Sequence, residues 1–181
     1  MKITFIRHAE SIANAEDILA LDSVELTTNG IKQAEKVAHR LKDDGFDIVL
    51  SSPIRRAFET AKIITRVINA PIITEELLAE KSYGSLLGKP IDEVNVEKES
   101  MPNLRDFTYG YDYRYWGGES GLDIKERIIK FVEKVKVEHE GKKVLAVSHG
   151  GIIRMMYIVF AKREYKEAFP IPNVSVHEFE L

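Results

Sequence analysis

Short runs of apolar, β-branched residues alternate along the chain with longer segments whose apolar residues repeat at helical spacing. The three clearest short runs cover residues 3–6, 47–50 and 143–147, and weaker candidates lie at residues 72–73 and 174–179. Short runs that are apolar throughout are typical of strands in a parallel sheet covered on both faces. The alternation therefore predicts an α/β fold with a mostly parallel central sheet.

Three of the longer segments begin at a residue type that commonly caps helices. The capping hydroxyl is Thr27 or Thr28 for the first, Ser52 for the second and Ser120 for the third. Ser52 precedes a proline, which is favoured at the first helical position. Ser120 and Asp123 resemble a capping box, in which each residue bonds to the backbone of the other. We therefore expect helices to begin at these three points.

The stretch from residue 90 to residue 116 does not follow the alternation. Its first part is rich in glutamate, and its second part runs from Phe107 to Trp116 with tyrosine at every second position from 109 to 115. We expect a partly helical insertion within a single domain of residues 1–181. Irregular insertions often lie over binding sites, so this one could form a lid.

Composition and charge narrow the class of protein. The 181 residues are 44% hydrophobic, which is enough for the core of one domain. The formal charge of -3 comes from 26 basic and 29 acidic residues mixed along the chain, so we expect no nucleic-acid partner. The absence of cysteine excludes thiolate chemistry, and no compact histidine pair indicates a zinc site. We expect no metal and no cofactor.

The apolar segments are too short to span a membrane. The stretch before Arg7 is briefer than a signal-peptide core. The most apolar later stretch, residues 152–161, contains Arg154 and falls well short of the roughly 20 residues that a spanning helix needs. We expect a cytoplasmic protein with no membrane partner.

Polar side chains follow each of the three clearest strand candidates directly. The first strand is followed by Arg7 and His8, the second by a serine pair and then Arg56, and the third by a serine and then His149. The carboxyl ends of parallel strands meet at one edge of a sheet, where helix N-termini favour anions. We therefore expect two histidines and an arginine to converge around an anion.

This set of side chains suits a phosphoryl group. A neutral imidazole can attack phosphorus, while arginines and a second imidazole neutralise the remaining oxygens. The leaving oxygen then needs a proton, and Glu80, shortly before a turn at Tyr83 and Gly84, is the candidate donor. Because His8 must be unprotonated and Glu80 protonated, we expect a bell-shaped dependence of rate on pH.

Six blocks of sequence resemble the histidine phosphatase, or phosphoglycerate mutase-like, superfamily in their order and internal spacing. They are Arg7-His8-Ala9-Glu10 with Asn14, Leu26-Thr27 with Gly30 and Gln33-Ala34, Ser51-Ser52-Pro53 with Arg56-Ala57 and Thr60-Ala61, Leu78 and Glu80 with Gly84 and Gly88, Gly118-Glu119-Ser120, and Ser148-His149-Gly150-Gly151. The resemblance covers most of the chain. Its main departure is Ala9, where the family more often has glycine.

The resemblance implies a fold and a set of roles. The fold is a three-layer α/β/α sandwich with a mostly parallel central sheet. His8 becomes phosphorylated, and Glu80 acts as general acid and then as general base toward water. The residues that bind the phosphate are Arg7, Asn14, Arg56, His149 and Gly150.

Substrate choice is expected to lie in residues outside the shared blocks or next to the nucleophile. Ser11, close to His8, could contact the substrate or only shape the turn. Tyr83 is shared by mutases and phosphatases of the family. Tyr109 and Arg114 belong to the tyrosine-rich segment. The remaining histidines, His39, His139 and His177, match no motif and are kept out of the site.

We expect a phosphomonoesterase that acts on a small phosphorylated metabolite. The alternative is a cofactor-dependent phosphoglycerate mutase, whose members are typically longer and have basic residues that bind the substrate carboxylate. Here residues 90–116 are short and contain no adjacent arginine pair. A phosphate-binding module that has lost catalysis is the third possibility. The physiological substrate and the oligomeric state stay open.

Overall fold

The structure is a computed structural model that describes residues 1–106, 108–164 and 170–181. Its helices and strands follow in this order along the chain: β1 Lys2–Arg7, α1 Ile12–Ala15, α2 Thr28–Arg40, β2 Ile48–Ser51, α3 Arg55–Ile68, β3 Ile72–Thr74, α4 Ile91–Glu99, β4 Arg105–Asp106, β5 Gly110–Tyr111, α5 Gly121–Glu138, β6 Val144–Ser148, α6 Gly150–Phe160 and β7 Val176–Glu180. Single turns of 3-10 helix lie at Glu76–Leu78, Gly84–Leu86, Pro102–Leu104 and Arg114–Trp116.

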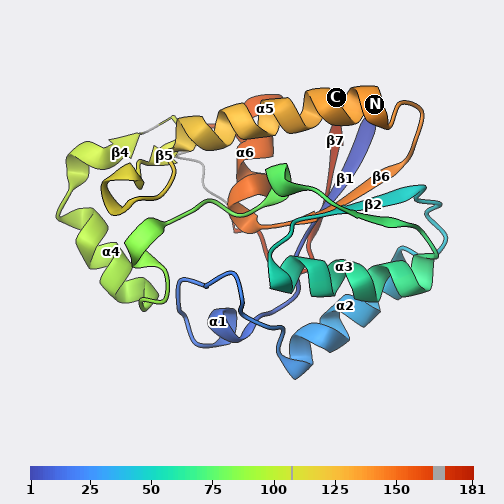
Figure 1. Cartoon of the computed structure of the whole chain (residues 1–181), viewed down its shortest axis with the longest axis horizontal. Helices are drawn as coiled ribbons and strands as arrows, with labels where there is room; N and C mark the ends of the chain where they lie inside the picture. The colour runs from blue at the N-terminus through green and yellow to red at the C-terminus, as the bar shows by residue number, and fades with distance from the viewer. Residues whose placement is uncertain (107, 165–169) are drawn as a thin grey trace.

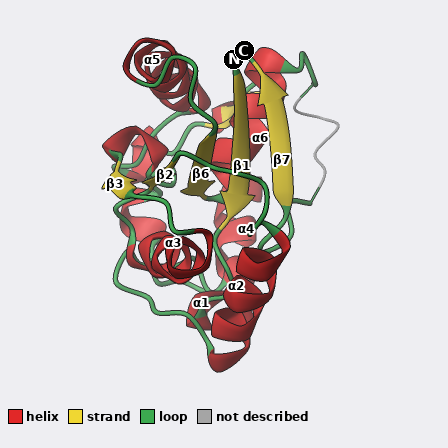
Figure 2. Cartoon of the chain, turned by 90° about the vertical axis from the view of Figure 1, so that its right-hand side faces the viewer, coloured by secondary structure: helices red, strands yellow, loops and turns green. Residues whose placement is uncertain are grey.

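The central sheet has five strands in the order β3-β2-β6-β1-β7. The pairs β2–β3, β2–β6 and β1–β6 are parallel, and β7 runs antiparallel to β1 at one edge. Figure 2 shows β1 and β7 side by side with opposite directions. The prediction of a mostly parallel sheet is confirmed.

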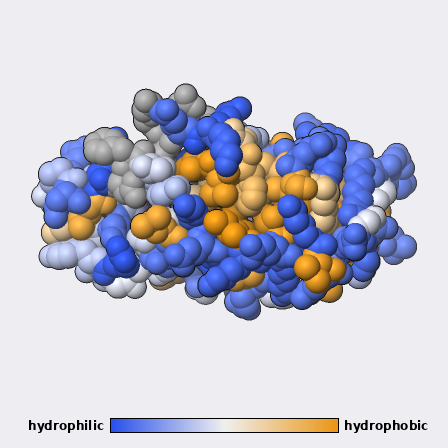
Figure 3. Space-filling model, turned by 90° about the horizontal axis from the view of Figure 1, so that it is seen from above, coloured by the Kyte–Doolittle hydropathy of each residue, from blue (hydrophilic) through white to orange (hydrophobic). Residues whose placement is uncertain are grey.

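Helices cover both faces of this sheet (Figure 1). Alternate residues of β1 point to opposite faces, as the twofold repeat of a strand requires. Ile3 and Phe5 join the core cluster with α5 and α6, whereas Ile6 joins the cluster with α2 and α3. The three-layer α/β/α sandwich is confirmed. Seen from above α5, the surface is largely hydrophilic with some hydrophobic residues between (Figure 3), and α5 itself exposes Leu122 and Val137.

The register of the parallel strands brings their carboxyl ends together. Arg7 at the end of β1 lies opposite Ser148 at the end of β6, and Ser51 at the end of β2 lies opposite Val147. The amide of His8 extends this pairing beyond β1 by donating to the carbonyl of Ser148 at 2.8 Å. The residues that follow the three strands therefore start from one edge of the sheet.

Two of the predicted helix starts are confirmed. The hydroxyl of Thr27 caps α2 by accepting a hydrogen bond from the amide of Gly30. Ser120 and Asp123 form the predicted capping box at the start of α5. Together these caps satisfy backbone donors that the first turns of both helices leave unpaired.

The predicted start of the second helix is wrong by two residues. Helix α3 begins at Arg55 with Ile54 as its N-cap residue, and no side chain caps it. Ser52 instead forms a turn before the helix, in which its Oγ accepts from the amide of Ile54 at 3.2 Å. The hydroxyl also forms a hydrogen bond with the ring of His149, the residue that follows β6, at 2.8 Å.

The insertion at residues 90–116 lies at one end of the molecule (Figure 1). Helix α4 and two 3-10 turns make it partly helical, as predicted, and β4 and β5 add a short antiparallel hairpin that the sequence did not predict. Phe107 lies outside the described residues. The last strand begins at Val176, two residues later than predicted, because Val174 has a φ of 52°, outside the strand region. Within the described ranges, no helix is long and apolar enough to cross a membrane.

Candidate active site

His8 directly follows β1 and is buried, with 3% of its surface exposed. Its Nδ1 lies 2.7 Å from the carbonyl oxygen of Ala9, and its Nε2 lies 3.3 Å from Nε of Arg56. A carbonyl can only accept and a guanidinium can only donate. The two contacts therefore assign the proton to Nδ1 and leave the lone pair on Nε2.

Burial and charge both keep the His8 ring neutral. Desolvation lowers the pKa of His8 well below its ordinary value of 6.5, and the positive charges of Arg56 and then Arg7 lower it further. The hydrogen bond to Ala9 acts in the opposite direction and is the weakest contribution. His8 is therefore an uncharged imidazole at neutral pH, which is the nucleophilic form.

Arg7 and His149 lie next to His8, and each has one buried nitrogen that forms no hydrogen bond with the described residues. Nη1 of Arg7 donates to the carbonyl of Ile171 at 2.5 Å, but its Nε is buried and has no hydrogen-bond partner among the described residues. His149 caps α6 and is completely buried, and its Nδ1 is likewise unpartnered within the described ranges. The ring centroids of His8 and His149 are 5.2 Å apart. Buried polar atoms without partners are rare, so this pair indicates the position of a ligand.

The pKa of His149 is also lowered well below 6.5, first by burial and then by the neighbouring His8, Arg56 and Arg7. Both imidazoles are therefore neutral while the two guanidinium groups carry the positive charge. Arg56 is 4% exposed and is fixed by its contact with His8 and by donation from Nη1 to the carbonyl of Leu21 at 3.1 Å. The site is electropositive and preorganised before any ligand enters.

Gly150 and Gly151 form the start of α6. A Cβ at Gly150 would lie 3.7 Å from Nε of Arg7, in ordinary contact. A Cβ at Gly151 would lie 2.4 Å from Oε1 of Glu80, so any other residue there would displace the Glu80 carboxylate. Instead, the amide of Gly151 donates to Oε2 of Glu80 at 3.3 Å. The first turn of α6 therefore binds Glu80 through the amide of Gly151, and Gly150 leaves the space beside Nε of Arg7 uncrowded.

Glu80 lies after the 3-10 turn Glu76–Leu78 and is half-buried. Its Oε1 accepts a hydrogen bond from the amide of Lys81 at 3.0 Å. Glu80 and Arg56 line the same cavity of about 380 Å³, to which Tyr83 also contributes. The predicted acid thus lies at the same cavity as a guanidinium group that contacts the predicted nucleophile.

Arg127 on α5 holds the segment that carries Glu80, and the sequence analysis missed it. Its Nη1 donates to the carbonyls of Leu77 at 3.0 Å and of Ala79 at 2.5 Å. Its Nη2 contacts Glu119, whose carboxylate accepts from the amide of Ser82 at 2.7 Å. These bonds fix the backbone on both sides of Glu80. No motif pointed to Arg127, because its partners lie about 50 positions earlier in the chain.

Asn14 and Ser11 form the capping box of α1. Oδ1 of Asn14 accepts from Ser11 and, at 3.2 Å, from Nδ2 of Asn173, which also donates to the carbonyl of His8 at 2.9 Å. Asn173 therefore ties Asn14 to the backbone of His8, and no motif in the sequence indicates this contact. The hydroxyl of Ser11 is engaged in the cap and is completely buried.

The other specificity candidates are separated in the structure. Tyr83 lies at the cavity of Glu80 and stacks edge-on against Tyr113 with ring centroids 4.8 Å apart. Tyr109 lies at a neighbouring cavity, with its hydroxyl accepting from Lys125. Arg114 is exposed and pairs with Asp112 at 2.5 Å, so the structure does not bring it to either cavity.

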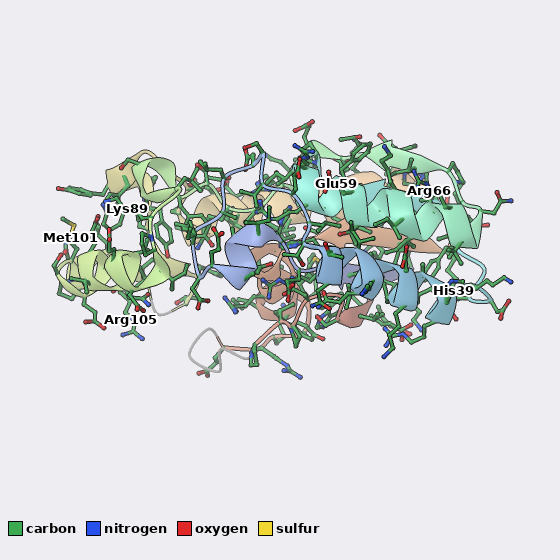
Figure 4. All side chains as sticks on the ribbon, turned by 90° about the horizontal axis from the view of Figure 1, so that it is seen from below. His39, Glu59, Arg66, Lys89, Met101 and Arg105 are labelled. Carbon is green, nitrogen blue, oxygen red and sulfur yellow. The ribbon has the colours of Figure 1, made fainter. Side chains whose placement is uncertain are left out.

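The remaining histidines lie away from the strand ends. His39 is exposed on α2, at the opposite end of the molecule from Arg105 (Figure 4). It borders a groove of about 740 Å³ between α2 and α3 that contains none of the residues gathered around His8. His139 caps the end of α5, and His177 lies on β7. Among the described residues, no cluster of acidic and histidine side chains is arranged to hold a metal ion.

A three-layer α/β/α protein with two imidazoles and two arginines at the carboxyl edge of its sheet belongs to the class of α/β proteins that bind anions at that edge. Within that class, the chain belongs to the histidine phosphatase superfamily (branch 1), whose family model matches residues 3–181.

Relatives of this chain include both phosphatases and mutases. Phosphoserine phosphatase 1 of Hydrogenobacter thermophilus is 32% identical over 158 residues, which cover 87% of this chain and 74% of that protein. A 2,3-bisphosphoglycerate-dependent phosphoglycerate mutase of Cytophaga hutchinsonii is 33% identical over 165 residues, covering 88% and 77%. The crystal structure of a phosphoserine phosphatase from Entamoeba histolytica, in complex with 3-phosphoglyceric acid, matches with a TM-score of 0.83 and 28% identity, covering 99% of this chain and 90% of that one.

Proposed function

We propose that the chain is a phosphomonoesterase that transfers the phosphoryl group of a small phosphorylated metabolite first to His8 and then to water. The observation that carries the proposal is the tautomer of His8. Nδ1 donates to the carbonyl of Ala9, and the lone pair of Nε2 lies beside the guanidinium group of Arg56. A neutral imidazole with its lone pair in an electropositive site is suited to attack phosphorus.

Each half of the reaction uses one bond exchange and one proton transfer. In the first half, Nε2 of His8 bonds to phosphorus, the ester P–O bond breaks, and the leaving oxygen takes the proton of Glu80. In the second half, the Glu80 carboxylate takes a proton from water, whose oxygen bonds to phosphorus while the P–N bond breaks. Inorganic phosphate leaves, and both residues regain their starting protonation states.

The phosphoryl oxygens are bound by groups that surround His8. Arg7 and Arg56 supply positive charge, and both arginines and His149 supply hydrogen bonds. Nε of Arg7 and Nδ1 of His149 support this role, because both atoms are buried and have no partner among the described residues. Asn14 and Gly150 complete the set. Among the described residues, the side-chain hydrogen bonds of Asn14 all use Oδ1, which leaves its Nδ2 to donate to the phosphate.

The test is phosphate release from p-nitrophenyl phosphate together with trapping of the phosphoenzyme. We expect the wild type to release phosphate and, after rapid acid-free denaturation, to carry an acid-labile phosphoryl group. His8→Ala should lose both. The matched control is His39→Ala, on the exposed surface of α2, which should keep both. Wild-type turnover by His8→Ala would refute the nucleophile assignment.

A phosphoglycerate mutase is the second candidate, and the mutase relative at 33% identity favours it. The short insertion, built from the nine-residue helix α4 and a hairpin of two-residue strands, favours the phosphatase. Isomerisation of 3-phosphoglycerate faster than release of its phosphate would reverse the order. Inactivity of folded protein toward every ester tested would instead identify a binding module.

A further inference from the structure

A second cavity of about 230 Å³ adjoins the cavity that contains Glu80. The two cavities share Lys81 and Tyr83 in their linings. Gly151, whose amide contacts Glu80, also lines the second cavity. The second cavity therefore lies beside Glu80, the residue that protonates the leaving oxygen in the proposed reaction.

Two lysines at the second cavity have no acidic partner. Among the residues that the structure describes, no carboxylate lies within ion-pair distance of Lys81 or Lys98. Three lysines elsewhere in the described chain, Lys2, Lys89 and Lys134, do pair with a carboxylate, as for Lys134 with Glu75 at 2.7 Å. The ammonium of Lys81 lies instead 4.7 Å from the ring centroid of Tyr113, and that of Lys98 lies 4.8 Å from that of Tyr111.

These ammonium groups are partly withdrawn from water. Burial is the main reason that the pKa of Lys81 is lowered to about 8; the charge of the Glu80 carboxylate opposes this shift, and the positive charges of Arg154 and Lys98 add to it. Burial also lowers the pKa of Lys98, with the charge of Arg105 next in size. Cations that face one another in a partly buried space repel, and an anion between them relieves both the repulsion and the lost hydration.

The remaining lining limits what can bind. Arg154 on α6 adds a third positive charge, and apolar side chains form much of the rest of the wall: Leu19, Ile91, Val94, Ile124, Met155 and Ile158. The volume is below the ~300 Å³ of an ordinary small-molecule pocket. The cavity therefore suits a compact anionic group on a short carbon chain.

We propose that the second cavity binds a second anionic group of the substrate, a carboxylate or a phosphate, through Lys81 and Lys98. The proposal rests on the proposed function, because it assumes that the scissile phosphate is bound at His8. It names the substrate class as small phosphate esters with a second anion at their other end.

The test compares esters that differ only in that second anion. Phosphoserine is paired with phosphoethanolamine, which lacks the carboxylate, and propane-1,3-diol bisphosphate is paired with the monophosphate. We expect kcat/KM in the wild type to favour the dianionic member of one pair by about tenfold or more, because the lysines lose their partner with the other member. The favoured pair identifies the group as carboxylate or phosphate.

The variants locate the effect. In the double variant Lys81→Gln and Lys98→Gln, the ratio within the favoured pair should fall toward one. The ratio is taken within one protein, so a general loss of activity cancels. The control is Lys62→Gln, an exposed lysine on α3, which should keep the wild-type ratio.

A ratio near one for both pairs in the wild type would overturn the proposal while leaving the phosphatase intact. A wild-type ratio that the double variant retains would also overturn it. If no ester is hydrolysed, the proposed function fails, and calorimetric binding of the same pairs to His8→Ala protein then decides. Preferential binding of the dianion that depends on the two lysines would support the second site, and equal binding would refute it.

Discussion

Nε of Arg56 donates a hydrogen bond to Nε2 of His8 at 3.3 Å, across 48 positions of sequence. The guanidinium group therefore lies beside the His8 nitrogen that bonds to phosphorus in the proposed reaction. Arg56→Ala should lower kcat for p-nitrophenyl phosphate by about 10²- to 10³-fold, the range for loss of one preorganised electrostatic donor. The neighbouring Arg55 is a matched control because it is exposed and pairs with Glu25 and Glu59 on the surface. Arg55→Ala should change kcat less than about twofold, and equal losses for both variants would contradict the assignment.

The neutral state of His8 predicts the acid side of the pH profile. The pKa of His8 is held well below 6.5 by burial and by Arg56 and Arg7, so the nucleophile stays unprotonated in mildly acidic solution. We expect kcat/KM to keep its plateau as pH falls through 6.5 and to decline only below it. The measurement is kcat/KM for p-nitrophenyl phosphate across the acidic range. An acid limb centred at or above 6.5 would show that His8 is not held neutral.

His8 and His149 should make the fold less stable in acid. The pKa values of His8 and His149 are both lowered well below 6.5 in the folded chain, whereas the unfolded chain protonates near the ordinary value. Below 6.5 the unfolded state therefore binds more protons, and the free energy of unfolding falls as pH falls, by at most about 1.4 kcal/mol per pH unit for each histidine. Urea unfolding of the wild type at neutral and acidic pH measures the loss.

Variants assign that loss to particular residues. His8→Asn and His149→Asn should each lose less stability than the wild type over the same pH step. His39→Asn, at an exposed position of α2, should match the wild type. If all four proteins lost the same free energy, groups other than the two buried imidazoles would account for the acid sensitivity.

Glu80 is expected to matter in proportion to the basicity of the leaving group. Glu80→Gln should slow hydrolysis of alkyl phosphates by about 10²- to 10⁴-fold, because an alkoxide needs a proton to leave. The loss should be much smaller with p-nitrophenyl phosphate, whose phenolate leaves unaided. The comparison uses kcat/KM, which reports phosphoryl transfer to His8 and not the shared hydrolysis step in which Glu80 acts as base. An equal loss of kcat/KM on both esters would argue against the acid role.

Arg127 should act through Glu80. Its hydrogen bonds to Leu77, Ala79 and Glu119 fix the backbone around the acid. Arg127→Ala should therefore lower kcat/KM for alkyl phosphates more than for p-nitrophenyl phosphate, which repeats the selectivity of Glu80→Gln in weaker form. Lys130→Ala, at an exposed position of the same helix, should leave both rates unchanged. A uniform loss on both esters with lowered thermal stability would indicate a purely structural role for Arg127.

The sheet and its edge could be predicted because each strand signal is local. The apolar runs of β1, β2 and β6 are each followed directly by polar residues, and parallel pairing places those residues at one edge. Caps such as Thr27 and the box of Ser120 and Asp123 were predictable for the same reason, since donor and acceptor lie within three positions.

Contacts between distant segments could not be predicted in this way. Ser52 was expected to cap a helix and instead binds His149, 97 positions later. Asn173 reaches His8 across 165 positions, and nothing in the composition around it indicates that contact. Arg114, a candidate for specificity, is different, because its partner Asp112 lies only two positions earlier and this contact was within reach of a local pattern. Two side chains make contact when they are close in space. Sequence spacing indicates that closeness only for residues that are near one another along the chain.

The position of β6 between β1 and β2 determines when the candidate active site can assemble during folding. The strand that separates the segments of His8 and Arg56 comes from residues 144–148, so those two segments cannot pair directly before it inserts. Non-local pairing of this kind is slow compared with helix formation. Recovery of turnover during refolding should therefore follow the helical signal in time, and a chain truncated before β6 should have no assembled centre. We therefore expect catalytic activity to appear only after the central sheet is complete.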